Sequence, residues 1–122
     1  MKEYFHQITL IVFVCSSSFI HAQPTSLPQI QVKGNLFVNN IGEPVVFRGL
    51  NTSDPYKLQA DKQWNKRYFQ EIKNWGANAV RFPVHPANWR TLGKEAYIKL
   101  LDEGIQWATE LQLYVIIDWH SM

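Results

Sequence analysis

The sequence predicts an α/β fold with a parallel sheet, and two observations lead to this prediction. Strand-like and helix-like segments alternate along the chain, which is the pattern of βαβ units. Residues 113–117 are all apolar, as expected for a parallel strand that is covered on both faces. Right-handed crossovers follow from this arrangement. A (β/α)8 barrel and an open doubly wound sheet both fit the pattern.

The first predicted element is a β-hairpin. Its arms are residues 36–38 and 45–47, and residues 39–43 between them contain the turn formers Asn and Gly. The second arm continues to Asn51 before the chain breaks at Asp54, which precedes a proline.

A helix is predicted over residues 61–75, because large apolar side chains recur there at helical spacing. Gly76 can adopt the left-handed conformation that ends a helix. The apolar stripe is interpreted as a face that packs on the sheet. It consists of Trp64, Tyr68, Phe69, Ile72 and Trp75.

The remaining segments complete the alternation. Residues 78–84 predict a short strand that Pro83 and Pro86 stop. Residues 94–111 have a helical apolar periodicity and lead into the apolar run described above. Together with the strand that ends at Asn51, this makes three strands and two helices after the hairpin.

The amino terminus predicts export. Residues 1–22 have the features of a secretory signal peptide, because residues 8–14 form an apolar run too short to span a bilayer and Ala22 is a small residue before the expected cleavage site. Residues 23–30 have the composition of a flexible linker, and the folded part of the chain is expected over residues 31–122. The mature chain is therefore expected to be secreted or periplasmic, and not held at a membrane.

Two other interpretations of the leader are weaker. It could be a buried helix of the fold, although its position before a linker argues against that. Lipid attachment at Cys15 is disfavoured because the bulky Val14 precedes it. Cys15 is the only cysteine, so the mature chain holds no disulfide and no thiol nucleophile.

The composition describes a folded domain rather than a disordered segment. Hydrophobic residues make up 46% of the 122 residues and charged residues 18%. The net charge is +2 and no basic cluster stands out, so no nucleic-acid partner is predicted. Residues 51–55, the first turn after a strand, hold no glycine, so a dinucleotide-binding loop is not indicated. We expect no cofactor.

Functional residues are expected where the parallel strands end. Active sites of both architectures collect at the carboxyl ends of the strands. That rule selects residues 51–56, 81–89 and 118–121. The polar and aromatic residues in these stretches are Asn51, Asp54, Arg81, His85, Trp89, Asp118, Trp119 and His120.

Each of these residue types has a structural interpretation as well as a functional one. Arg81 stands between apolar neighbours, so it either orients a carboxylate at the site or pairs with a structural acid. A histidine such as His85 or His120 is more often a hydrogen-bonded structural residue than a catalyst. A metal site of His85, Asp118 and His120 is conceivable, but no metal-binding motif supports it. We predict no metal.

Trp89 and Trp119 allow two interpretations. They could belong to the core, or they could present flat apolar faces to sugar rings. With Asn51 and His85, they are our candidate substrate-binding residues.

Three segments together resemble the family-5 glycoside hydrolases, the cellulase-type retaining β-glycanases. They are GLN at residues 49–51, WGANAVRFPV at residues 75–84 and VIIDWH at residues 115–120. The preceding residues 33–49 resemble the hairpin that opens those domains, so the resemblance runs from about residue 31 to the last residue. It implies a TIM barrel, of which the first three strands are present here.

The resemblance also implies roles for individual residues. Arg81 matches the arginine that holds the nucleophilic carboxylate, and His120 matches the histidine beside the scissile bond. His85 lies where some members carry a substrate-contacting side chain. The implied partner is a β-linked polysaccharide, whereas the resemblance makes no prediction of the oligomeric state.

The two catalytic glutamates of that family follow its fourth and seventh strands, and no acid of this chain matches them. Retaining hydrolysis needs two carboxyl groups about 5–5.5 Å apart. Asp54 and Asp118 are the only acids expected near the strand ends, and they are not expected to form such a pair. We therefore expect an inactive fragment of a glycosidase. The alternatives are a non-catalytic carbohydrate-binding or interaction module and another TIM-barrel hydrolase.

Overall fold

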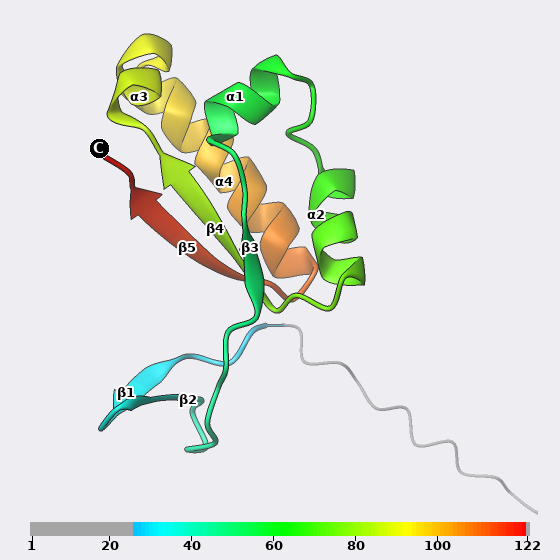
Figure 1. Cartoon of the computed structure of the whole chain (residues 1–122), viewed down its shortest axis with the longest axis vertical. Coiled ribbons are helices and arrows are strands. Elements are labelled where there is room, and N and C mark those ends of the chain that lie inside the picture. Colours follow the sequence, from blue (N-terminus) through cyan, green and yellow to red (C-terminus); the bar gives the residue numbers. More distant parts are fainter. Residues whose placement is uncertain (1–25, 122) are drawn as a thin grey trace, which may run out of the picture.

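The computed structural model describes residues 26–121, which form a parallel sheet, a set of helices and a small hairpin (Figure 1). The predicted signal peptide, with Cys15 and Ala22, lies outside the described residues. Within residues 26–121, none of the helices has the length and apolar character that a bilayer span requires.

Three parallel strands form the sheet in the order β3 (Gly49–Asn51), β4 (Ala79–Val84) and β5 (Tyr114–Trp119). The predicted α/β arrangement with three parallel strands is confirmed. In the described part of the chain, β3 and β5 each pair along one edge only, with β4 between them. The sheet is therefore open over these residues, and a closed barrel is not formed by them.

The helices pack on one face of the sheet and around its carboxyl end. In Figure 1, α4 (Lys94–Glu110) lies behind the strands and α2 (Lys66–Asn74) lies to their right, on the side of β3. The shorter helices α1 (Pro55–Ala60) and α3 (Pro86–Leu92) lie near the arrowheads, where the strands end. The opposite face of the sheet carries no helix of the described residues.

A cluster of aromatic rings forms the core between β4 and the helices. The rings of Trp64, Phe69 and Phe82 meet edge to face, with centroids 5.2–5.6 Å apart. The Trp64 indole N–H donates to the carbonyl of Leu100 at 3.1 Å, so its polar atom is satisfied inside the core. Each large side chain that is fully buried in this way contributes about 1.5–3 kcal/mol.

The predicted helix over residues 61–75 begins later in the structure. Asn65 has extended backbone and its side chain accepts from the backbone N–H of Tyr68, so helix α2 begins at Lys66. Trp75 is 78% exposed and caps the carboxyl end of α2. Its assignment to the buried stripe was wrong, because its side chain lines an open cavity beside the edge of β3 instead of packing in the core.

The described residues form four helices rather than the two predicted. Helices α1 and α3 were missed, and both begin with a proline, at Pro55 and Pro86. The first turn of a helix tolerates proline because its N–H would have no partner there. The prediction that Pro83 helps to stop this strand is wrong. Pro83 pairs with Asp118 within β4, and the strand continues to Val84, directly before the His85–Pro86 start of α3.

The hairpin consists of β1 (Gln31–Lys33) and β2 (Leu36–Val38), paired antiparallel around Gly34. Gly34 has a φ of +62°, a conformation that glycine adopts without steric cost. The predicted arm over residues 45–47 is not a strand. Pro44 makes only an isolated bridge with β2, and it lacks the N–H that would extend the ladder.

The hairpin lies at the amino end of the sheet, far from α1 and α3 (Figure 1). Phe47 connects the two parts, since its ring contacts Phe37 at 5.3 Å and Tyr114 at 5.4 Å between centroids. The Tyr114 hydroxyl also donates to the carbonyl of Pro28 at 3.1 Å. The predicted linker therefore contacts the first residue of β5.

The substitution Gly104→Ala should destabilise the chain. Gly104 is buried in α4, and a Cβ there would collide with the Trp64 ring. Overpacking of this kind costs about 1–3 kcal/mol, which exceeds the roughly 1 kcal/mol that alanine gains over glycine in a helix. Urea unfolding should show a net loss for G104A, whereas Asp102→Ala, at an exposed position of α4, should change little. A more stable G104A would contradict this packing.

Candidate functional site

Arg81 lies in the middle of β4, level with Asn51 at the carboxyl end of β3, and it contacts three polar side chains. Its Nη2 atom forms an ion pair with Asp118, and its Nη1 atom donates to the Asn51 side-chain oxygen at 3.3 Å. The same Nη2 atom lies 3.5 Å from Nδ1 of His120. Side chains alternate along a strand, so these four residues share the face of the sheet that is opposite the core residue Phe82.

Asp118 connects Arg81 to His120. Its Oδ2 atom lies 2.9 Å from Nδ1 of His120. A carboxylate paired with a guanidinium only accepts hydrogen bonds, so Nδ1 is the donor and Nε2 of His120 is available to a ligand. All three side chains keep roughly a third of their surface exposed, at 28–35%. The group is therefore firmly oriented but accessible from solvent.

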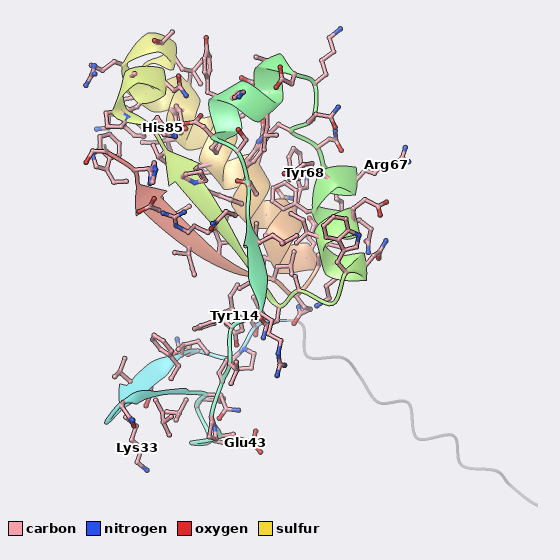
Figure 2. All side chains as sticks on the ribbon, in the orientation of Figure 1. Lys33, Glu43, Arg67, Tyr68, His85 and Tyr114 are labelled. Atoms are coloured by element: carbon pink, nitrogen blue, oxygen red, sulfur yellow. The ribbon has the colours of Figure 1, made fainter. Side chains whose placement is uncertain are left out.

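His85 lies against His120. The two imidazole rings meet edge to face with centroids 5.0 Å apart. His85 is the N-cap of α3, and its backbone N–H donates to Oδ2 of Asp54 at 2.8 Å. Figure 2 shows His85 where β4 passes into α3, at the end of the sheet opposite Tyr114. The structure thus brings together four predicted site residues, which are Asn51, Arg81, His85 and His120.

The two predicted tryptophans form a separate pair. The rings of Trp89 and Trp119 meet edge to face at 5.7 Å, and Trp89 also contacts Tyr97 of α4 at 5.3 Å. Trp119 alternates with Asp118 and His120 along the chain, so its side chain is on the other face of β5. Trp119 is nevertheless 56% exposed. The pair does not line the face that carries Arg81.

Asp54 is buried, and its carboxylate joins α1, α4 and His85 through hydrogen bonds that the sequence did not reveal. The residue is 3% exposed, and its Oδ1 atom accepts from the backbone N–H of Tyr56 and from the Tyr97 hydroxyl, at 2.8 and 2.9 Å. An acid directly before a proline at a helix start is a capping signal, and it could have indicated part of this role. The contact with Tyr97 carried no sequence signal, because that residue fitted the apolar face of α4.

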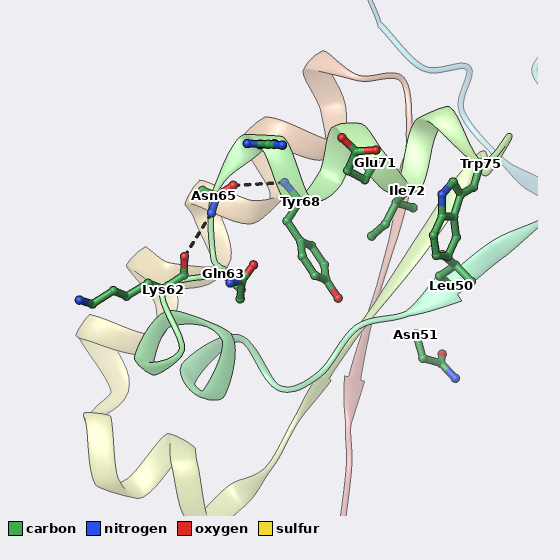
Figure 3. A pocket seen from close by; sticks show the side chains of 10 residues that line it. Leu50, Asn51, Lys62, Gln63, Asn65, Tyr68, Glu71, Ile72 and Trp75 are labelled. Carbon is green, nitrogen blue, oxygen red and sulfur yellow. Dashed lines mark hydrogen bonds between the residues drawn. The ribbon is translucent and has the colours of Figure 1, made fainter.

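One cavity lies away from this group of residues. It measures about 720 Å³ and lies between α2 and the unpaired edge of β3 (Figure 3). Tyr68, Ile72 and Trp75 line it, and Asn51 is its only residue from the polar group. A smaller hollow of about 190 Å³ lies on the face that carries Arg81 and Ile116. Of the polar group, Asn51 and Arg81 line this hollow. We place the candidate site on this face of the sheet, where Arg81 also meets Asp118, the partner of His120.

The conceivable metal site of His85, Asp118 and His120 is not assembled. Among residues 26–121 there is no group of three or more His, Cys, Asp or Glu side chains with the arrangement that a metal ion requires. Asp118 is instead engaged by the Arg81 guanidinium.

A family model described as cellulase (glycosyl hydrolase family 5) matches residues 38–122. The chain belongs to glycosyl hydrolase family 5. The predicted resemblance is thereby confirmed, and the match covers β3, β4, β5 and all the helices of the described part. The polar group around Arg81 lies within the matched residues.

Solved structures and curated proteins of similar sequence include β-glucanases and endoglucanases. The crystal structure of a β-glucanase from Saccharophagus degradans is 42% identical with a TM-score of 0.77, over 80% of this chain and 30% of that one. The same enzyme was also solved in complex with cellotetraose. Endoglucanase A of Butyrivibrio fibrisolvens is 28% identical over 106 residues, and endoglucanase C of Evansella cellulosilytica is 30% identical over 108 residues.

The chain spans only part of these relatives. The two alignments with endoglucanases cover 77% and 78% of this chain, but 23% and 12% of the relatives' own lengths. This chain is therefore related to family-5 β-glucanases and endoglucanases over a part of their domain.

Replacing Tyr97 with phenylalanine should reduce the loss of stability at high pH. Burial and the hydrogen bond to Asp54 raise the pKa of Tyr97 above its ordinary value near 10. The unfolded chain therefore releases this proton first, and above pH ~10 the free energy of unfolding falls by about 1.4 kcal/mol per pH unit from this group. Below pH ~10 the contribution is constant. Unfolding measured between about pH 10 and 11.5 should show a shallower slope for Y97F, and equal slopes would contradict the assignment.

Proposed function

We propose that this chain is the N-terminal part of a retaining β-glucan hydrolase of the endoglucanase type. The observation that carries the proposal is the group of Asn51, Arg81, Asp118 and His120 on one open face of the sheet, in a chain of family 5. The cellotetraose complex of the Saccharophagus relative supports a β-linked glucan as substrate.

Arg81 has the hydrogen-bonding capacity to orient a second carboxylate. A guanidinium carries five N–H donors, and the contacts with Asp118 and Asn51 use a minority of them. We propose that the remaining donors hold the nucleophilic carboxylate, which the rest of the catalytic domain supplies. The positive charge would keep that carboxylate ionised and therefore nucleophilic.

His120, His85 and Asn51 are proposed to bind the sugar beside the bond that is cleaved. The Nε2 atom of His120 and the amide nitrogen of Asn51 are not used in the contacts described above, and both suit sugar hydroxyl groups. Trp89 and Trp119 remain candidates for a more distant sugar contact. Their edge-to-face pair leaves part of the Trp119 ring surface exposed.

The chain alone is proposed to be inactive. Retaining hydrolysis needs a protonated carboxyl group and an ionised one on either side of the glycosidic bond. Asp118 is engaged by Arg81, and Asp54 is buried behind three hydrogen bonds. Neither acid can take one of these positions without losing its partners.

Assays of two proteins test this proposal directly. Residues 23–122 and the product of an extended reading frame should be expressed and incubated with soluble β-glucans, and reducing ends should be measured. We expect turnover by the extended product, including in chelator because two carboxyl groups need no metal. We expect none from residues 23–122. Turnover by the shorter chain would disprove its proposed inactivity.

A non-catalytic carbohydrate-binding module is the second candidate. The exposed indoles of Trp75 and Trp119, at 78% and 56%, favour it because flat aromatic surfaces suit sugar rings. Two results together would support this module over the enzyme. Cello-oligosaccharides would raise the melting temperature of residues 23–122, and the extended product would hydrolyse no β-glucan.

Export is proposed from residues 1–22. Expression of the whole chain in a secreting bacterium should give a mature protein that begins at Gln23, which N-terminal sequencing would reveal. Retention of residue 1 in the exported fraction would contradict the proposed cleavage after Ala22.

Arg81→Lys should lower the turnover of the extended product. Lysine keeps the charge but lacks the planar fork that can hold Asp118 and a second carboxylate together. We expect kcat to fall by about 10²-fold, the range seen when one preorganised donor is removed. Arg67→Lys, at an exposed position of α2, is the matched control and should leave kcat unchanged. A wild-type kcat for R81K would exclude this role of Arg81.

A further inference from the structure

Asp54 is a buried carboxylate with an unusual set of partners. It is 3% exposed, and within residues 26–121 none of the ion pairs includes it. Three neutral donors compensate it instead, which are two backbone N–H groups and the Tyr97 hydroxyl. Burial of a charged group is costly unless it is hydrogen-bonded, so this arrangement demands that all three donors stay in place.

The three donors come from three different elements. Tyr56 belongs to α1, Tyr97 to α4, and His85 is the residue between β4 and α3. A helix cap alone would need one carboxylate oxygen, which here is the Oδ1 atom that accepts from Tyr56. The second oxygen, Oδ2, goes to the N–H of His85, which is outside α1. Asp54 therefore does more than cap its own helix.

The His85 side chain connects this buried carboxylate with the polar face of the sheet. Its backbone N–H donates to Oδ2 of Asp54 at 2.8 Å, and its ring centroid lies 5.0 Å from that of His120. His120 in turn bonds to Asp118, the partner of Arg81. A displacement of the His85 backbone would move its ring away from His120 and remove one side of the support for that imidazole.

We propose that Asp54 and Tyr97 are positioning residues, which fix His85 and through its ring fix His120 at the candidate site. The positioning is a property of the fold, whereas its effect on a bound glucan rests on the function proposed above. Tyr97 orients the carboxylate: its hydroxyl shares Oδ1 with the N–H of Tyr56 and leaves Oδ2 directed at His85.

Two substitutions remove different parts of this link. Asp54→Asn retains the ability to cap α1, but an amide has only one acceptor oxygen. It cannot accept both from Tyr56 and Tyr97 on one side and from the N–H of His85 on the other. Tyr97→Phe keeps the ring that packs on Trp89 and removes only the hydroxyl. Asn65→Ala is the matched control, because Asn65 caps α2 and its hydrogen bonds reach neither imidazole.

The test is the nuclear Overhauser effect between the ring protons of His85 and His120 in the isotope-labelled 122-residue chain. We expect a clear cross-peak in the wild type and in N65A, and its loss or strong weakening in D54N and Y97F below their melting temperatures. An unchanged cross-peak in both variants would overturn the proposal and leave Asp54 a purely stabilising residue. Absence of the cross-peak from the wild type would overturn it as well. If D54N does not fold, Y97F decides.

The effect on catalysis is a separate measurement on the extended product. Misplacement of a site group by about 1 Å can cost up to 10²-fold in rate, so kcat of folded Y97F should fall by about tenfold or more. A tenfold loss that accompanies the lost cross-peak supports positioning. A wild-type kcat despite a lost cross-peak would restrict the role to the fold. An extended product without glucanase activity would disprove the proposed function, and the cross-peak result would still decide the positioning.

Discussion

The pairing of β4 along both of its edges is the constraint on which the rest of the structure depends. Its register places Asn51 of β3 level with Arg81, and Asp118 of β5 two residues further along the same face. The intervening residues, Val80 and Phe82, are almost fully buried against the helices. One strand therefore forms the core with one face and the polar group with the other, and a shift by one residue would exchange the two.

The sequence predicted the parts of the fold that depend on local pattern. The apolar runs identified β4 and β5, and helical periodicity identified α4 to within a residue. The errors concern short segments. Helices α1 and α3 contain few residues, and their starts depend on local residues such as the prolines at their first positions. The arms of the hairpin were shifted because its tight turn is at Gly34 and not at residues 39–43. The start of a short helix and the position of a tight turn depend on contacts between segments, and the hydrophobic periodicity of one segment carries no information on these contacts.

The candidate site was predictable to a similar degree. Arg81 and His120 were selected because they follow strands and match a family motif, and the structure places both beside Asp118. The roles assigned to them remain predictions, as do those of the tryptophans. Asp54 was noticed only as an acid near a strand end. Its burial, and the hydroxyl of Tyr97 that reaches it, are consequences of how α1 and α4 pack together.

The two open edges of the sheet have a consequence for the handling of this chain. Over the described residues, β5 exposes Ile116 and Ile117 at 45% and 47%, beside a row of backbone groups along its unpaired edge. Such an edge can pair with any extended chain, including another copy of itself. Self-association of the chain should therefore increase steeply with its concentration, and overexpressed protein should collect in inclusion bodies unless a further strand covers β5.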